Sequence, residues 1–149
     1  GAIIRLCANT GATLHLVEPL GFSLEDRLLR RAGLDYHDLA DVQIHASWEA
    51  LLEHVDGRML MFTSHGQVRY DSVAYESTDW LIFGTEPTGL SAELLTYTSQ
   101  ESHIVIPMRP NNRSLNLSNA ATLVLYEGWR QLGFYGADER FDPAPVAEQ

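Results

Sequence analysis

Three short runs of apolar residues stand out in the second half of the chain. They cover residues 59–62, 80–83 and 103–106, and residues typical of turns follow each run. A continuous apolar run of this length is typical of a strand that is covered on both faces, as in a parallel sheet. The pattern therefore predicts three buried strands, each leading into a loop.

The first half of the chain carries other periodicities. Apolar residues spaced three and four apart predict a helix over residues 2–8, and alternation predicts strands over 13–17 and 41–45. Ser23 and Ser47 are good N-cap residues. They predict two further helices, over 24–31 and from 48 through 54.

A long amphipathic segment lies near the end of the chain. Its apolar spacing predicts a helix over roughly 118–132, capped by Ser118 or Asn119 and followed by Gly133 as its stop signal. Strands that alternate with helices in this way indicate an α/β domain, with a mostly parallel sheet and helices on both faces.

The length and composition fit one globular domain. With 149 residues, 45% of them hydrophobic, the chain can bury a substantial core. We expect one domain over residues 1–136, followed by a flexible, acidic tail over 137–149. No apolar run is long enough to span a bilayer, so no membrane partner is expected. The lone Cys7 cannot form an internal disulfide, which favours the cytoplasm.

The net charge of −10 argues at first against a nucleic-acid partner, but the acidic residues are unevenly distributed. Residues 1–34 have four arginines and three acidic residues, a net charge of +1, and residues 102–133 have three arginines and one acidic residue, a net charge of +2. Residues 35–101 have two arginines and twelve acidic residues, a net charge of −10. The two mildly basic segments therefore remain candidates for binding a nucleic acid.

Metal and nucleophile chemistry have little support in the sequence. The six histidines are scattered without the spacing of a metal site, and no G-x-S-x-G elbow is present. Cys7 lies in an apolar helical pattern, which favours a packed side chain over a nucleophile. We therefore expect no metal, and of the histidines only His65, in a loop after a strand, is of interest.

The loops after the three buried strands are the candidate ligand-binding segments, since ligands of open α/β sheets bind beyond the carboxyl ends of the strands. They begin with the sequences TSHG, GTEPTG and PMRPNNRS. The glycines of the second loop would let a ligand approach the backbone. The third loop is rich in Asn, Ser and Arg and precedes a helix start. It is either a simple capped connection or a polar binding loop.

The order of these segments resembles the SPOUT methyltransferases, S-adenosylmethionine-dependent enzymes that methylate the ribose 2′-hydroxyl of RNA. GAIIRLCAN at the start is similar to the end of their first motif, FGTEPTGL to the second, and IPM with SLNLSN to the third. RRAGLDYH, from residue 30 to residue 37, is similar to the TrmL-type branch, which methylates the wobble cytidine or uridine of tRNA.

The resemblance implies roles for individual residues. Arg5 would face the target ribose, and the catalytic set would be Arg5, Ser114, Asn116 and Tyr126. S-adenosylmethionine would be held, largely by backbone groups, at Phe62, Thr63, Gly84, Glu86, Gly89, Ile106, Met108, Ser114, Leu117 and Asn119. The RNA would be bound by Arg27, Arg30, Arg31, Arg109 and Arg113.

The resemblance also implies an architecture. Members of the family have a deep C-terminal trefoil knot and form homodimers through their first and last helices, which allows Tyr126 to serve the neighbouring subunit. They begin with a strand before the position of Gly1, which this sequence lacks. The expected partner is the anticodon stem-loop of tRNA, and the expected product of the cofactor is S-adenosyl-L-homocysteine. Methylation of rRNA or of another tRNA site, and a non-catalytic RNA- or nucleotide-binding module, are the alternatives.

Overall fold

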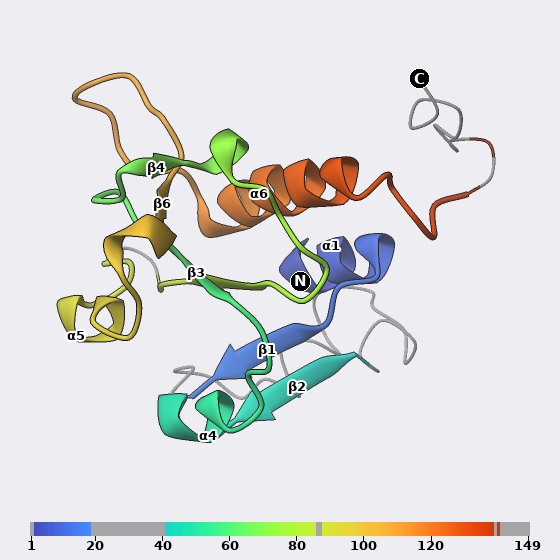
Figure 1. Ribbon diagram of the computed structural model, residues 1–149, viewed down its shortest axis with the longest axis horizontal. Coiled ribbons are helices and arrows are strands. Elements are labelled where there is room, and N and C mark those ends of the chain that lie inside the picture. Colours follow the sequence, from blue (N-terminus) through green and yellow to red (C-terminus); the bar gives the residue numbers. More distant parts are fainter. Residues whose placement is uncertain (1, 19–40, 86–87, 139, 141–149) are drawn as a thin grey trace. The chain divides into compact units, whose positions relative to one another are not determined.

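The computed structural model describes residues 2–18, 41–85, 88–138 and 140 (Figure 1). These residues belong to two compact units, Gly1–Val55 and Asp56–Gln149. The acidic tail predicted over 137–149 lies almost entirely outside the described residues, as does the helix predicted over 24–31. Among the helices that are described, none has the length and apolar character needed to cross a membrane.

The first unit contains the two predicted strands as a parallel pair. β1 (Leu14–Val17) pairs with β2 (Val42–His45) over its full length. α1 (Ala2–Thr10) precedes β1 and confirms the helix predicted from the apolar spacing. Gly11, with φ of 80°, ends this helix and donates its N–H to the carbonyl of Cys7 at 2.9 Å.

The last helix of the first unit confirms the predicted N-cap. α4 (Trp48–Leu52) begins after Ser47, whose side-chain oxygen accepts a hydrogen bond from the N–H of Ala50 at 3.1 Å. The helix is shorter than predicted: it ends at Leu52, two residues before His54. Leu51 is buried, as the amphipathic pattern requires.

The second unit is built on a parallel sheet that contains all three strands predicted from the apolar runs. These are β3 (Met59–Phe62), β5 (Trp80–Phe83) and β6 (His103–Val105). A strand that the sequence did not indicate, β4 (Val68–Arg69), completes the order β4-β6-β3-β5 among the described residues. Every strand pair is parallel, but the described strands form two separate sheets instead of the single sheet expected.

The connection between β3 and β4 crosses β6, because β6 lies between these two consecutive strands. Gly66 makes this close crossing possible. A Cβ atom on Gly66 would lie 2.7 Å from the carbonyl carbon of Ile104 and 2.8 Å from the carbonyl oxygen of His103. Backbone passes over backbone here, so no residue with a side chain fits without displacing the strand.

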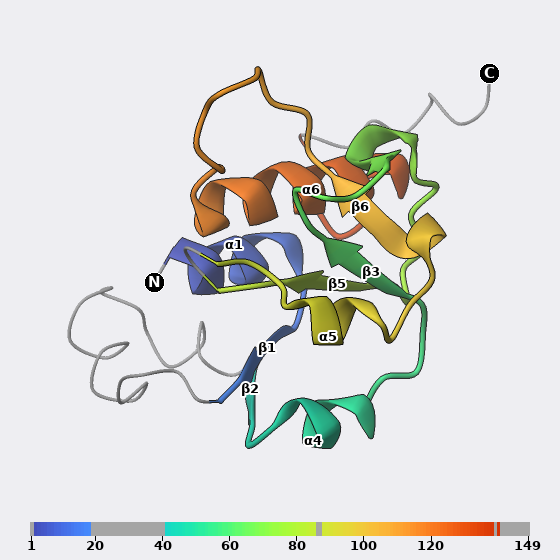
Figure 2. The same cartoon turned by 90° about the vertical axis from the view of Figure 1, so that its left-hand side faces the viewer.

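α6 (Leu117–Gln131) covers one face of this sheet and completes the core (Figure 2). Its Val124 is fully buried against strand residues such as Ile104, and a single contiguous cluster results. The buried members of this cluster are Leu60, Phe62, Val73, Tyr75, Ile104 and Val124.

The start of α6 corrects the predicted cap. The helix begins at Leu117, one residue earlier than expected, so the N-cap is Asn116 and not Ser118 or Asn119. The Asn116 side-chain oxygen accepts hydrogen bonds from the N–H groups of Ser118 at 2.9 Å and of Asn119 at 3.3 Å. Gly133 follows the helix with φ of 84°, as its predicted role as a stop requires.

Three short helical elements were not predicted. They are η1 (Tyr70–Ser72), α5 (Ala92–Leu95) and η2 (Gln100–Ser102). A single turn is too short to produce an apolar periodicity, so the sequence carried little signal for them beyond the N-cap Ser91, which accepts from Leu94 N–H.

Candidate functional site

The three loops singled out in the sequence leave the sheet at the same edge. Phe62 at the end of β3 is in register with Phe83 at the end of β5, and also with Ile104 in β6. Since all three strands are parallel, their carboxyl ends point the same way. The structure therefore confirms that the loops beginning at Thr63, Gly84 and Ile106 start next to one another.

The loop after β5 closes on itself through its two glycines. The N–H of Gly89 donates to the carbonyl of Thr85 at 2.7 Å, and Gly89 has φ of 71°. A Cβ on Gly84 would lie only 2.0 Å from the carbonyl carbon of Gly89. Both glycines are therefore required by the loop's own backbone, whatever it binds. Glu86 lies outside the described residues.

The loop after β6 is long and exposed from residue 107 to residue 116, and it extends away from the sheet in both views (Figures 1 and 2). It presents an apolar side chain, Met108, of which 42% is exposed. Arg109 and Arg113 are exposed, and neither forms an ion pair with a carboxylate within the part of the chain that the structure describes. Ser114 is exposed in the same loop.

The first of these loops is tied firmly to the sheet. The N–H of Thr63 donates to the carbonyl of Ile104 at 2.9 Å, and the Thr63 hydroxyl accepts from the N–H of His65 at 3.2 Å. The ring of Phe62 is buried and stacks on Phe83, with centroids 4.7 Å apart. The N–H of Thr63 thus has a partner in the sheet, while its hydroxyl can still donate a hydrogen bond to a ligand.

α6 carries the remaining candidates on and near its exposed side. Asn119 and Tyr126 are seven residues apart, about two turns, so they lie on one side of the helix. Leu123 lies between them and is also exposed. Leu117 is half-buried in the first turn of the helix, directly after Asn116. Asn116 uses its side chain as the helix cap, a structural role that its predicted catalytic role did not foresee.

The predicted basic residues of the first unit are only partly described. Arg5 lies on the exposed side of α1. The predicted RNA-binding residues Arg27, Arg30 and Arg31 lie outside the described residues. Cys7 is partly buried, and burial raises the pKa of its thiol to about 11, so the thiol is protonated at neutral pH. This supports a packed side chain rather than a nucleophile.

The histidines show an arrangement that the sequence did not predict. His15 Nδ1 and His45 Nε2 share a hydrogen bond of 2.9 Å, with their rings stacked at 5.1 Å, and His45 also contacts the ring of His54 at 5.0 Å. Burial lowers the pKa of both His15 and His45, and the neighbouring imidazoles lower it further. No group of three or more His, Cys, Asp or Glu side chains suited to a metal ion is found among the described residues.

His65, the histidine of interest in the sequence, lines a small cavity of about 40 Å³ together with Gln67, Gln100 and His103. His103 is held there by contacts of its Nε2 with the carbonyl of Leu95 at 3.0 Å and with the Thr98 hydroxyl at 3.1 Å. Ligand pockets are typically about 300–1,000 Å³ in volume, so this cavity is far smaller than a site for a nucleoside.

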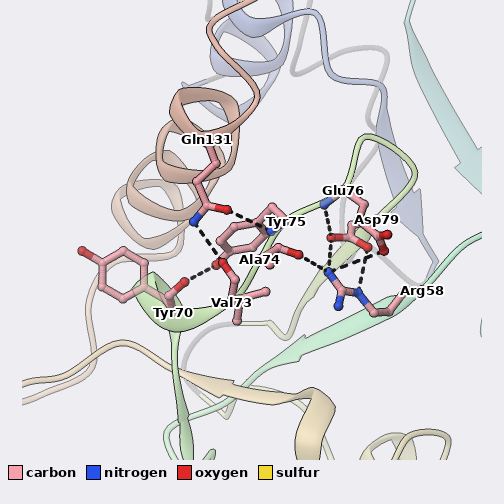
Figure 3. A network of polar contacts seen from close by, with 8 residues as sticks. All are labelled: Arg58, Tyr70, Val73, Ala74, Tyr75, Glu76, Asp79 and Gln131. Atoms are coloured by element: carbon pink, nitrogen blue, oxygen red, sulfur yellow. Dashed lines mark hydrogen bonds and ion pairs between the residues drawn. The ribbon is translucent and has the colours of Figure 1, made fainter. Parts of the chain in front are cut away.

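A polar network fastens the connection between β4 and β5 to α6 (Figure 3). The Gln131 side chain accepts from the N–H of Tyr75 at 2.9 Å and donates to the carbonyl of Val73 at 2.9 Å. At the other end of the connection, Arg58 donates to Asp79 at 2.7 and 2.9 Å. The position of α6, and hence of the candidate residues on it, depends on this network.

A second contact of the same network is partly buried next to α6. The Tyr75 hydroxyl donates to the carbonyl of Tyr70 at 2.6 Å, and burial raises the pKa of this hydroxyl well above its usual range. Gly128 of α6 packs directly on the Tyr75 ring, since a Cβ there would lie 3.4 Å from a ring carbon. The helix can therefore lie close to the connection.

Comparison with known proteins gives the chain a family. The model of the SpoU rRNA Methylase family matches residues 1–126. A tRNA (cytidine(34)-2'-O)-methyltransferase from Burkholderia cenocepacia is 53% identical over 139 residues, which are 91% of this chain and 89% of that protein.

Two solved structures are also similar. One concerns the 2-OH methylation of C/U34 on tRNA. It is 38% identical, with a TM-score of 0.79, and the match covers 88% of this chain and 86% of the chain in that structure. The other, an AdoMet-bound rRNA methyltransferase from Sinorhizobium meliloti, is 28% identical, with a TM-score of 0.67. The match covers 88% of this chain and 51% of the chain in that structure. With a family model matched over most of its length and a relative more than half identical, this chain belongs to the SpoU rRNA methylase family.

Proposed function

We propose that this protein transfers the methyl group of S-adenosylmethionine to the ribose 2′-hydroxyl of the wobble nucleotide, cytidine or uridine, in tRNA. The observation that carries the proposal is the 53% identity, over 91% of the chain, with a relative named for this reaction on cytidine 34. The family and the arrangement of the three loops at one sheet edge support it.

The residues at this sheet edge fit an adenosyl cofactor. Met108 and Leu115 offer exposed apolar surface for a purine ring, and the neighbouring loops offer backbone and side-chain polar groups for its edges and for the ribose. We assign this role to the cofactor residues predicted from the sequence, with Glu86 included. When bound, S-adenosylmethionine supplies an electrophilic methyl group on a sulfonium.

The protein's own contribution is mainly to hold the 2′-hydroxyl in line with that methyl group. A guanidinium group is a donor only and does not serve as a base in proteins, so Arg5 orients the ribose or the adjacent phosphate. The hydroxyl proton leaves late, or to water. Ser114, Asn116 and Tyr126 shape the site, Asn116 by fixing the start of α6.

The tRNA is bound through arginines. Arg109 and Arg113 are exposed and point to a role in contacting phosphates of the anticodon stem-loop, which Arg guanidinium groups bind well. Arg27, Arg30 and Arg31 are assigned the same role from the resemblance. A homodimer would combine two such sets of arginines, which offsets the acidic character of the chain.

We place the dimer interface on α1 and α6. Leu123 and Tyr126 form an exposed apolar strip on α6, which fits burial against a second copy and would bring Tyr126 to the partner's site. The crossing of β6 by the connection between β3 and β4 supports the deep trefoil knot. The domain would comprise residues 1–136, with helices on both faces of its sheet, and would act in the cytoplasm.

The proposal is tested by incubating the purified chain with labelled S-adenosylmethionine and total tRNA, then mapping the labelled nucleoside. We expect a 2′-O-methylated wobble cytidine or uridine. The family description names rRNA, so a parallel reaction contains rRNA in place of tRNA. Methyl transfer to rRNA and none to tRNA would favour rRNA as the substrate. Cofactor binding without transfer to any RNA would favour a non-catalytic binding module.

A further inference from the structure

The turn after α6 adopts a backbone conformation that a phenylalanine rarely accepts. Gly133 and Phe134 both have positive φ, of 84° and 54°. This left-handed conformation suits glycine, but the Cβ atom of any other residue approaches the following carbonyl oxygen. Strain of this kind persists only where surrounding contacts hold the residue in place. The contacts of Phe134 therefore show which side chains keep this strained turn in place.

Phe134, Trp129 and Tyr126 pack in series, with the Trp129 ring in the middle. The Phe134 ring meets the Trp129 ring edge to face, at 5.2 Å and 83°, and the Trp129 ring meets Tyr126 in the same way, at 5.6 Å and 72°. These three side chains, Tyr126, Trp129 and Phe134, are called the aromatic row below. Edge-to-face contact is the favourable geometry for aromatic pairs.

The strained turn also fixes the middle ring of the aromatic row. The N–H of Phe134 donates to the carbonyl of Trp129 at 2.9 Å. The indole N–H of Trp129 donates to the carbonyl of Tyr135 at 3.0 Å. Trp129 is thus held by a ring contact with Phe134 and by a hydrogen bond to the next residue. Both depend on the path of the backbone through Phe134.

Within one copy of the chain, the Trp129 ring is the aromatic contact of Tyr126 among the described residues. Tyr126 is 40% exposed, on the same side of α6 as Leu123, so much of its ring faces away from the core. An exposed side chain on a helix moves between staggered rotamers within nanoseconds. Contact with the fixed Trp129 ring favours one of those orientations.

We propose that Phe134 and Trp129 are positioning residues, which hold the Tyr126 ring in the orientation used for methyl transfer. The inference rests on the proposed function, in which Tyr126 shapes the site. Phe134 itself touches neither the cofactor nor the RNA in this account. It acts through Trp129, and the strained turn is retained because that turn places the Phe134 ring.

The test uses Phe134→Gly, because glycine accepts the positive φ and the turn keeps its path while the ring is removed. Tyr135→Ala is the matched control, since the Tyr135 side chain is 69% exposed and only its backbone carbonyl contacts the aromatic row. We expect Phe134→Gly to lower kcat about tenfold, with the Kd for S-adenosylmethionine and the KM for tRNA unchanged. Phe134→Tyr and Tyr135→Ala should retain the wild-type kcat.

A double variant separates action through Tyr126 from a general effect. If Phe134 acts through Tyr126, Phe134→Gly causes no further loss in a Tyr126→Ala background. An equal tenfold loss in that background, or an unchanged kcat in Phe134→Gly alone, would overturn the proposal.

A measurement that does not depend on activity keeps this result apart from a failure of the proposed function. In protein labelled with ¹³C in the tyrosine rings, Phe134→Gly should shift the Tyr126 signal towards that of a freely rotating ring, and Tyr135→Ala should not. An unshifted Tyr126 signal overturns the positioning role even if methyl transfer is observed. A shifted signal without methyl transfer to any RNA supports the positioning and overturns the proposed function.

Discussion

Replacing Gln131 by methionine removes the contact that fastens α6 to the connection between β4 and β5. The amide of Gln131 accepts from the N–H of Tyr75 and donates to the carbonyl of Val73 and to the Glu127 carboxylate, at 2.9, 2.9 and 2.7 Å. Methionine has nearly the same length and can form none of these bonds. Its apolar side chain would preserve much of the packing.

The expected loss follows from the number and surroundings of these bonds. Val73 and Tyr75 are buried, with 8% and 7% of their surface exposed, so their backbone groups would be left without partners and poorly hydrated. An unsatisfied buried polar group costs about 1–3 kcal/mol. For two such groups, we expect Gln131→Met to lower the free energy of unfolding by about 2–6 kcal/mol.

The assay is urea denaturation followed by tryptophan fluorescence, since Trp80 and Trp129 both belong to the second unit. Gln100→Met is the matched control: it makes the same chemical change at an exposed glutamine of that unit and should leave stability nearly unchanged. A loss below about 1 kcal/mol in Gln131→Met would mean that Gln131 does not satisfy buried backbone groups, because even one unsatisfied buried group should cost that much.

Three further variants test the site and the first unit. Gly84→Ala should open the loop after β5, because its Cβ would lie 2.0 Å from the Gly89 carbonyl carbon; calorimetry should then find S-adenosylmethionine binding weakened about tenfold or more, and unchanged binding would contradict the role of this loop. His15 and His45 have lower pKa values in the folded protein than in the unfolded chain, so the unfolded chain binds protons first as the pH falls. The free energy of unfolding is therefore not reduced by these two histidines above a pH of about 6.5, and it declines below that pH. His45→Phe should flatten this decline in thermal melts between pH 7 and 5, and an equally steep decline would exclude the pair as its cause. Arg5→Ala should abolish methylation with nearly unchanged cofactor affinity, and full activity would remove Arg5 from the mechanism.

The apolar runs predicted the strands of the second unit well, because a strand covered on both faces consists of consecutive apolar residues. Continuous apolar runs indicated β3, β5 and β6, and their common direction placed the candidate loops at one edge. The two residues of β4 carry no such mark, since a strand this short has no period. Its partner was also unpredictable, because β6 comes 34 residues later in the chain.

Local chemistry was predicted less well where several residues compete for one role. Asn116, Ser118 and Asn119 can all cap a helix, and only the position of the first turn selects Asn116. The contact between His15 and His45 depends on the pairing of β1 with β2 across 30 residues, which no local pattern reveals. Gln131 looked like an ordinary polar position of an amphipathic helix.

We propose that the loops after β3, β5 and β6 form one site for the methyl donor. The most direct measurement is a crystal structure of the protein with S-adenosyl-L-homocysteine, the product of the cofactor. We predict that the ligand contacts the backbone near Gly84, Ile106, Met108 and Leu117, with Ser114 close by. A ligand bound well away from this sheet edge would contradict the account, even if methyl transfer to tRNA were observed.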